Sequence, residues 1–393
     1  MSILLLVIGI LLFIGLVVVH EFGHFIMARR NGVEVEEFGI FFPPRIYRHK
    51  TKAGWDFTIN LLPLGGFVKL KGEHDDDTEK GTFGAASTWV KSKIMAAGVV
   101  MNLITALVLF TILALVGIPK LIDNQFTVKS DTHTVSTKVL VSYVEPGSPA
   151  AKSGLKQGDQ LVAYTAQQPS QAAATGDFRS QQDLMHTTSK FQGYKVKIEY
   201  KRNGQTHFAS TTLRSDKEVD ASQKTDNPKG HLGIVPTEFS LQRSTWSAPI
   251  VAVGFATQVT VLTMQGLGHA VAGLGSTLAG IFTGNTAARQ HGQTKASEQV
   301  SGPVGIFVIL RDGSLLGYQF MLLIIAVISL TLAIMNILPV PALDGGRLWI
   351  TLIARAFKKK LSSNVENALN TAGFLILISL MVIITFVDVK RFF

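Results

Sequence analysis

The sequence predicts a polytopic α-helical membrane protein with four transmembrane helices, a membrane-associated β-hairpin and one extracytoplasmic α+β domain. Only 16% of the 393 residues are charged, against about 25% in ordinary soluble domains, and the mean hydropathy is +0.31. A helix needs roughly 17–25 mainly apolar residues to span a bilayer. Four segments meet this requirement: residues 3–19, 94–118, 320–338 and 371–387.

The first apolar segment is expected to remain in the protein as a transmembrane helix. A cleavable signal peptide is the alternative, but such peptides begin with a charged region and have a shorter apolar core. Here the apolar run starts at Ile3 and continues through a short polar cluster to Met27. We therefore interpret it as a retained helix.

Two stretches after the first helix predict the β-hairpin. Residues 55–61 and 67–70 are interpreted as strands on either side of a turn at residues 63–66. An exposed edge of this hairpin could accept a peptide as an added strand, whereas a cytoplasmic hairpin without a binding role is the alternative.

A mostly polar region separates the second and third spans, and within it residues 134–213 predict a small globular domain. A strand, a turn, a helical turn and the entry into a second strand are expected in succession, followed by a β-hairpin. These elements are placed at residues 139–144, 145–149, 150–154, 155–162 and 195–205, with a flexible loop at 165–176 and a polar linker at 217–229.

Residues 249–282 are ambiguous. They are long, apolar and nearly uncharged, which permits a fifth span, but their many Gly, Thr, Gln and Ser residues also suit an amphipathic helix on the membrane surface.

The predicted domain boundaries are 1–124 for the N-terminal membrane part, 125–216 for the globular domain, 217–318 for the linker with this segment, and 319–393 for the C-terminal membrane part.

Composition limits the chemistry. The chain has no Cys, which excludes disulfides, thiolate zinc sites, iron–sulfur clusters and a cysteine nucleophile. Its net charge of +10 fits the gathering of Lys and Arg in cytoplasmic loops of membrane proteins better than it fits nucleic-acid binding. We therefore expect no nucleic-acid partner.

His20, Glu21 and His24 form an H-E-x-x-H pattern at the end of the first apolar segment. On a helix, two His at positions i and i+4 project from one face and can share a Zn²⁺ ion, while the Glu can take a proton from a metal-bound water. Ionisable groups in a membrane segment are costly and usually functional. A His/Glu cluster that reaches water at the end of the span is the alternative.

A catalytic zinc site needs a third protein ligand. Asp344 can supply it, because Pro339 and Pro341 break the third predicted helix shortly before it. A simple turn residue is the alternative for Asp344. Asn336, near the end of that helix, could hydrogen-bond a substrate carbonyl or cap its own helix, and both readings stay open. His269 and His291 lack partners at metal-ligand spacing and are interpreted as surface residues.

Together these motifs resemble the intramembrane site-2 zinc metalloproteases, most closely the bacterial branch of the regulator of sigma-E protease and its Gram-positive single-PDZ relatives. The resemblance rests on H-E-F-G-H in the first helix and N-x-x-P-x-x-x-L-D-G in a late helix. Residues 144–155 resemble the PDZ domain of these enzymes. Residues 64–68, 98–102 and 301–306 match other family motifs.

The resemblance implies one zinc ion per chain, held by His20, His24 and Asp344, with Glu21 as the catalytic carboxylate. Substrate-binding roles are expected for Asn336, Pro339, Gly65, Gly66, Phe67 and Asn102.

The expected function is an intramembrane zinc endopeptidase that acts on transmembrane segments of single-span proteins, such as membrane-bound anti-sigma factors or signal-peptide remnants, in regulated intramembrane proteolysis. A membrane metal transporter and an inactive PDZ scaffold are the alternatives. A transporter does not need a carboxylate between the two histidines, so Glu21 favours the enzyme. The PDZ-like domain could bind a peptide or a newly made C-terminus, or act as a size filter.

The shared metal also predicts topology in a bacterial inner membrane. His24 and Asp344 can meet only if the first and third helices run in the same direction, which requires one crossing between them. Residues 249–282 should then stay on the extracytoplasmic side with the PDZ-like domain. The basic residues that follow the first helix, and those that precede the fourth, should be cytoplasmic. They are Arg29, Arg30, Arg45, Arg48, Lys50, Lys52, Lys358, Lys359 and Lys360.

Overall fold

The computed structural model describes residues 2–73, 77–167, 172–223, 228–283, 302–358 and 362–392. The chain divides into two compact units. We call Ala114–Ser247 the sheet unit, and Ile3–Leu113 together with Ala248–Phe393 the helical unit. The metal-ligand candidates all belong to the helical unit.

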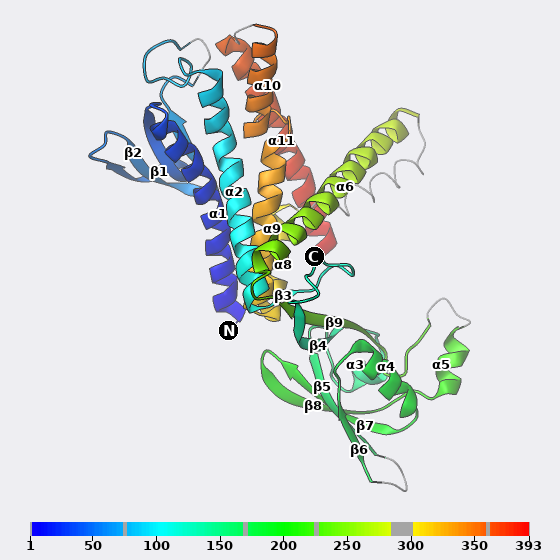
Figure 1. Cartoon of the computed structure of the whole chain (residues 1–393). Helices are drawn as coiled ribbons and strands as arrows, with labels where there is room; N and C mark the ends of the chain where they lie inside the picture. Colours follow the sequence, from blue (N-terminus) through cyan, green and yellow to red (C-terminus); the bar gives the residue numbers. More distant parts are fainter. Residues whose placement is uncertain are drawn as a thin grey trace. The chain divides into compact units, whose positions relative to one another are not determined.

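Long apolar helices build the helical unit (Figure 1). Within the described residues, five helices are long and apolar enough to cross a membrane. Four of them confirm the predicted apolar helices. The five are α1 (Ser2–Arg30), α2 (Thr88–Val116), α6 (Ala248–Thr283), α9 (Tyr318–Ile337) and α11 (Ser363–Phe392).

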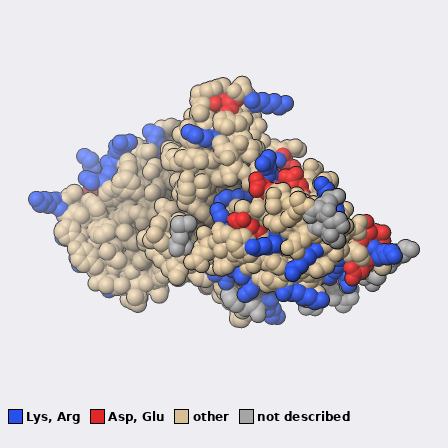
Figure 2. All heavy atoms as spheres, turned by 90° about the horizontal axis from the view of Figure 1, so that it is seen from below, with Lys and Arg blue, Asp and Glu red and all other residues tan. Residues whose placement is uncertain are grey.

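The exterior of these helices is largely apolar. In α11 only 11% of the most apolar stretch is buried inside the protein, so its Leu, Ile, Val and Phe side chains face outward. Figure 2 likewise shows a broad area of surface without acidic or basic side chains. Soluble proteins rarely leave so much contiguous apolar surface exposed, so lipid is the natural solvent for these helices.

Close packing of α1 against its neighbours depends on glycines. A Cβ at Gly9 would lie 2.4 Å from Sδ of Met321 on α9. A Cβ at Gly23 would lie 2.6 Å from the carbonyl oxygen of Ala97 on α2. A larger residue at Gly23 would push α1 away from α2, because the backbone of α2 cannot give way, whereas one at Gly9 would require the Met321 side chain to move.

α6 is one continuous helix over the segment that the sequence left ambiguous. It contacts α9, and Phe255 on α6 packs edge-to-face against Phe110 on α2 with ring centroids 5.1 Å apart. The next described helix is α8 (Pro303–Leu316). Because α6 raises the number of candidate spans to five, the predicted count of four membrane crossings stays a prediction.

A two-stranded sheet follows α1. It consists of β1 (Val35–Lys50) and β2 (Asp56–Leu70), which form a hairpin. One part of β1 pairs with two different parts of β2. Residues 38–40 of β1 pair with residues 66–68 on one side and with residues 57–59 on the other. Residues 56–59 pair again with residues 47–50. Residues 66–70 therefore form one edge of the folded sheet.

The predicted pairing of this hairpin was wrong. Residues 55–61 and 67–70 do not pair across a turn at 63–66, because β1 lies between them and both halves belong to β2. Gly39 of β1 permits this arrangement, since a Cβ there would lie 2.3 Å from the ring of Phe67. The sequence prediction missed β1 and therefore paired the two segments with each other.

The sheet unit contains a seven-stranded antiparallel sheet in the order β3-β9-β4-β5-β7-β8, with β6 paired to β5. Its apolar core includes Val139, Leu161, Leu184 and Ile198, all nearly inaccessible. The strands are β3 (Ile118–Pro119), β4 (His133–Val144), β5 (Gln160–Gln167), β6 (Ala174–Asp177), β7 (Lys195–Arg202), β8 (Gln205–Thr212) and β9 (Ile234–Arg243). Its helices are α3 (Pro149–Lys152), α4 (Gln181–Lys190) and α5 (Asp216–Gln223).

Several predictions for this region are confirmed. The strand at 139–144 lies in β4, the helical turn at 150–154 overlaps α3, and β7 and β8 form the expected hairpin with Arg202 opposite Gln205. The predicted linker at 217–229 instead begins with α5, and β9 follows it to complete the sheet. The predicted loop at 165–176 contains the end of β5 and the start of β6, and residues 168–171 lie outside the described residues.

Candidate metal centre

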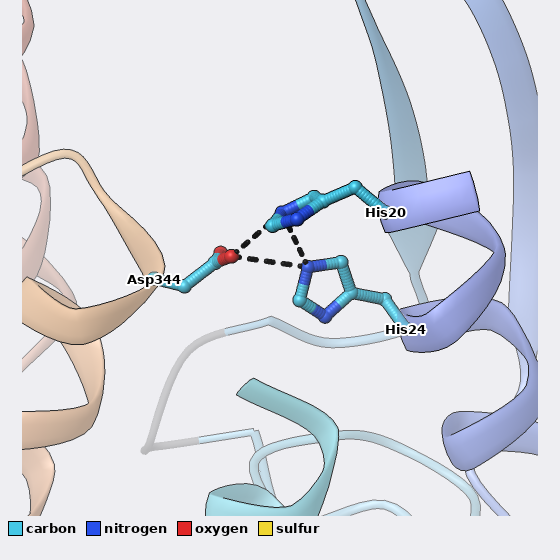
Figure 3. A group of neighbouring side chains, drawn as sticks. All are labelled: His20, His24 and Asp344. Atoms are coloured by element: carbon cyan, nitrogen blue, oxygen red, sulfur yellow. Dashed lines mark hydrogen bonds and ion pairs between the residues drawn. The ribbon is translucent and has the colours of Figure 1, made fainter. Parts of the chain in front are cut away.

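The last turns of α1 and the start of α10 (Asp344–Ala356) bring three ligand atoms together (Figure 3). Nε2 of His20 lies 2.9 Å, and Nε2 of His24 lies 3.1 Å, from Oδ2 of Asp344. The two Nε2 atoms are 3.2 Å apart. In the described part of the chain this is the one His, Cys, Asp and Glu group that could hold a metal ion.

These separations fit a tetrahedral zinc site. Zinc binds His nitrogen and carboxylate oxygen at about 2.0–2.1 Å, so neighbouring ligand atoms around a tetrahedral ion lie about 3.3 Å apart. Two nitrogens and one oxygen also match the three protein ligands of a catalytic site, which leaves the fourth position open to water or substrate. The three side chains therefore suit a catalytic zinc ion.

Asp344 reaches the histidines because the backbone folds back sharply after α9. The helix ends at Ile337, and Ala342 has a φ of 71°, in the left-handed region. A Cβ at Gly345 would lie 2.4 Å from the carbonyl oxygen of Leu338, and one at Gly346 would lie 2.1 Å from that of Val340. Both glycines are thus required for the approach that aims Asp344 at α1.

α2 closes the centre from behind. A Cβ at Gly98 would lie 2.5–2.6 Å from the imidazole atoms of His20 and His24, so only glycine leaves room for both rings. Nδ1 of His24 lies 2.7 Å from the carbonyl oxygen of Ile94 and donates a hydrogen bond to it. This bond places the proton on Nδ1 and leaves the Nε2 lone pair for a metal.

Asn102 on α2 does the same for His20. Its side-chain amide is fully buried, with Nδ2 placed 3.1 Å from Nδ1 of His20 and Oδ1 left without a hydrogen-bond partner. The amide oxygen and nitrogen of Asn102 can be exchanged, which puts Oδ1 in the place of Nδ2. Nδ1–H of His20 then donates a hydrogen bond to Oδ1. That assignment satisfies the buried oxygen and frees Nε2 of His20 for a metal.

Glu21 lies beside the ligands in a cavity of about 230 Å³, which His24 and Asp344 also line. Its Cγ packs against Gly66, and Val68 lines the same cavity. A carboxylate next to an open metal position is placed to exchange protons with a water bound there.

The residues expected to bind substrate fall in different places. Gly66 and Phe67 line the cavity, and Gly65 packs beside the Phe42 ring. Asn102 lies behind His20 and does not line the cavity. Asn336, near the end of α9, and Pro339, just after it, do not line the cavity either.

Of the two histidines interpreted as surface residues, His269 is exposed, and His291 lies outside the described residues. Sequence reasoning missed two charged residues that line the cavity, Glu73 and Arg347. Arg347 follows Asp344 by one helical turn, which is the only signal that could have placed it there. Glu73 lies in a polar stretch of sequence and has no comparable spacing to a predicted site residue.

Comparison with known proteins agrees with this geometry. The sequence model of peptidase family M50 matches residues 8–380. A protein of Clostridium acetobutylicum named "Putative zinc metalloprotease" is 30% identical over 391 residues, covering 99% of this chain and 98% of its own. One of the same name from Clostridium perfringens is 29% identical over 386 residues, covering 98% of both chains. "Zinc metalloprotease RasP" of Shouchella clausii is 27% identical over 453 aligned positions, again covering 98% of both chains.

Proposed function

Because this chain belongs to peptidase family M50 and is a membrane zinc metalloprotease of the site-2 type, we propose that it cleaves transmembrane segments of single-span proteins. The observation that carries the proposal is the meeting of His20, His24 and Asp344 beside Glu21 at the end of an apolar helix. We assign one zinc ion to the three ligands, and we assign Glu21 as the general base. Membrane-bound anti-sigma factors and signal-peptide remnants are the substrate classes proposed.

The chemistry divides between the ion and the chain. Zinc, when bound, supplies the Lewis acid that activates a water and polarises the scissile carbonyl. Glu21 takes the proton from the attacking water and passes it to the leaving amine. Ile94 and Asn102 hold the imidazoles of His24 and His20 in the orientation that keeps both Nε2 atoms on the metal side.

Peptide hydrolysis also requires an extended substrate, since a transmembrane helix hides its carbonyls in its own hydrogen bonds. The edge of β2 at residues 66–70 is a site where an unwound segment can add as a strand, and it lines the same cavity as Glu21. Strand addition there satisfies the backbone groups that unwinding exposes. The edge thus supports both substrate binding and local unwinding.

We further propose the topology that the shared metal implies. The end of α1 and the start of α10, which carry the proposed ligands, lie on the cytoplasmic side, near the basic residues Arg29 and Arg30. The sheet unit, as the PDZ-like domain, is then extracytoplasmic. It binds a peptide or a C-terminus, or it limits the size of substrates.

Co-expression with a tagged single-span substrate tests the proposed function. The wild-type protein should cleave within the transmembrane segment, and Glu21→Gln should not, while both accumulate in the membrane. Equal cleavage by the two proteins would refute Glu21 as the base.

A further inference from the structure

The edge of β2 that faces the cavity already carries an internal ligand. Among the described residues, 66–70 pair only with β1, so their other side is open. Val68 and Leu70 both line the cavity that contains Glu21 and Asp344, and so does Glu73. The side chain of Glu73 turns back onto this edge.

The backbone N–H of Leu70 points to the open side. The next N–H, that of Lys71, donates to the carbonyl oxygen of Glu34 at 2.9 Å, on the β1 side. Successive N–H groups of a strand point to opposite sides, so the Leu70 N–H points away from β1. It donates to Oε1 of Glu73 at 3.0 Å.

The N–H of Val68 points the same way as that of Leu70, and Val68 lines the cavity that contains Glu21. It lies two residues from Leu70, a spacing of roughly 6.6 Å along a strand. Carbonyls two residues apart in an extended peptide have the same spacing, so one substrate strand can bond both N–H groups at once. The substrate carbonyl that binds the Val68 N–H would lie beside Glu21. The carbonyl that binds the Leu70 N–H should then belong to a substrate residue two positions away.

Arg347 fixes Glu73 in this place. Its Nη1 lies 3.5 Å from Oε2 of Glu73, and its Nη2 donates to the Glu73 backbone carbonyl at 3.3 Å. The guanidinium also stacks over the ring of Phe83, 5.7 Å from the ring centroid. Each carboxylate oxygen of Glu73 therefore has its own partner, one on the strand and one on α10.

We propose that the Glu73 carboxylate is an internal placeholder for the substrate backbone, held on the Leu70 N–H by Arg347 until an incoming strand displaces it. The inference rests on the proposed addition of substrate to this edge. Its consequence is competition, because a substrate carbonyl must replace the Glu73 oxygen before the strand is complete. Glu73 is then a residue that weakens substrate binding without touching the reaction.

Steady-state kinetics of the purified full-length enzyme with a single-span substrate in detergent tests this. Glu73→Ala should lower KM by about 10-fold with kcat unchanged, because the competing charged acceptor is gone. Glu73→Gln keeps an oxygen for the Leu70 N–H but loses the pairing with Arg347, so its KM should fall less. Glu79→Ala is the matched control, since Glu79 belongs to the same loop and pairs with Lys71 instead.

An unchanged or raised KM in Glu73→Ala would overturn the placeholder, as would an equal fall in Glu79→Ala. A purely structural role for Glu73 would lower kcat or protein yield rather than KM. Val68→Pro, which removes the other outward N–H, separates the two proposals. Slower cleavage by Val68→Pro with unchanged KM in Glu73→Ala overturns the placeholder alone, whereas normal cleavage by Val68→Pro overturns strand addition and the placeholder with it.

Discussion

His20 and Asp344 are 324 positions apart in the chain, and Nε2 of the first lies 2.9 Å from Oδ2 of the second. The contact requires the end of α1 and the start of α10 to lie at the same level of the helical unit. It also requires glycine at each place where another backbone or ring comes close. The centre therefore depends on small residues as much as on its ligands.

Gly98 provides the first prediction. Gly98→Ala puts a methyl group within 2.6 Å of both imidazoles, so the rings must move and zinc affinity should fall by about 10-fold or more. Gly15→Ala on α1 is the control, because nothing lies within 4 Å of its Cβ position. Zinc affinity measured by competition with a chelator should separate the two variants, and equal losses would contradict the steric account.

Asn102 provides the second prediction. Asn102→Ala removes the acceptor that orients His20, and the loss of such an outer hydrogen bond typically costs about 10- to 100-fold in metal affinity. Asn102→Asp restores an acceptor oxygen and should recover much of that affinity. Chelator competition on the purified variants measures both effects. An Asn102→Ala protein with wild-type zinc affinity would show that His20 needs no orienting partner.

The third prediction concerns unwinding of the substrate. Gly or Pro in the substrate's membrane segment should speed cleavage, and a poly-Leu segment should resist it, because the helix must open before attack. Initial rates on matched single-span substrates provide the measurement. Equal rates for the poly-Leu and the helix-broken substrates would count against the unwinding step.

The fourth prediction concerns topology, which the absence of native Cys makes simple to map. Cysteines placed singly at the exposed positions Ser189, in the sheet unit, and Asp312, on α8, should react with an impermeant maleimide in intact cells. One at exposed Ser362, before α11, should react only after permeabilisation. If Ser189 and Asp312 fall on opposite sides, α6 crosses the membrane and the proposed topology is wrong.

Much of the helical unit and its centre could be predicted from the sequence. Apolar runs locate spanning helices because a helix that crosses the bilayer needs about 20 mainly apolar residues. The i, i+4 spacing of His20 and His24 places both on one helix face before any tertiary contact is known. Asp344 could be paired with the two histidines because a catalytic zinc site needs a third protein ligand.

The parts that could not be predicted depend on long-range packing. Residues 55–61 and 67–70 were paired with each other, since nothing local indicates that Phe38 and its neighbours lie between them. β9 was not predicted as a strand, because its partner β4 is about a hundred residues away in the chain. The contact of Glu73 with Leu70 and Arg347 joins a polar loop to α10, and no periodicity of either segment encodes it.

The zinc content of purified variants tests the central claim, that His20, His24 and Asp344 hold one ion while Glu21 acts on water, most directly. Metal analysis should give about one zinc per chain for the wild type, for Glu21→Gln and for the control Asp312→Ala on α8. The variants His20→Ala, His24→Ala and Asp344→Ala should each retain little or none. An Asp344→Ala protein that keeps one zinc per chain would contradict the three-ligand centre.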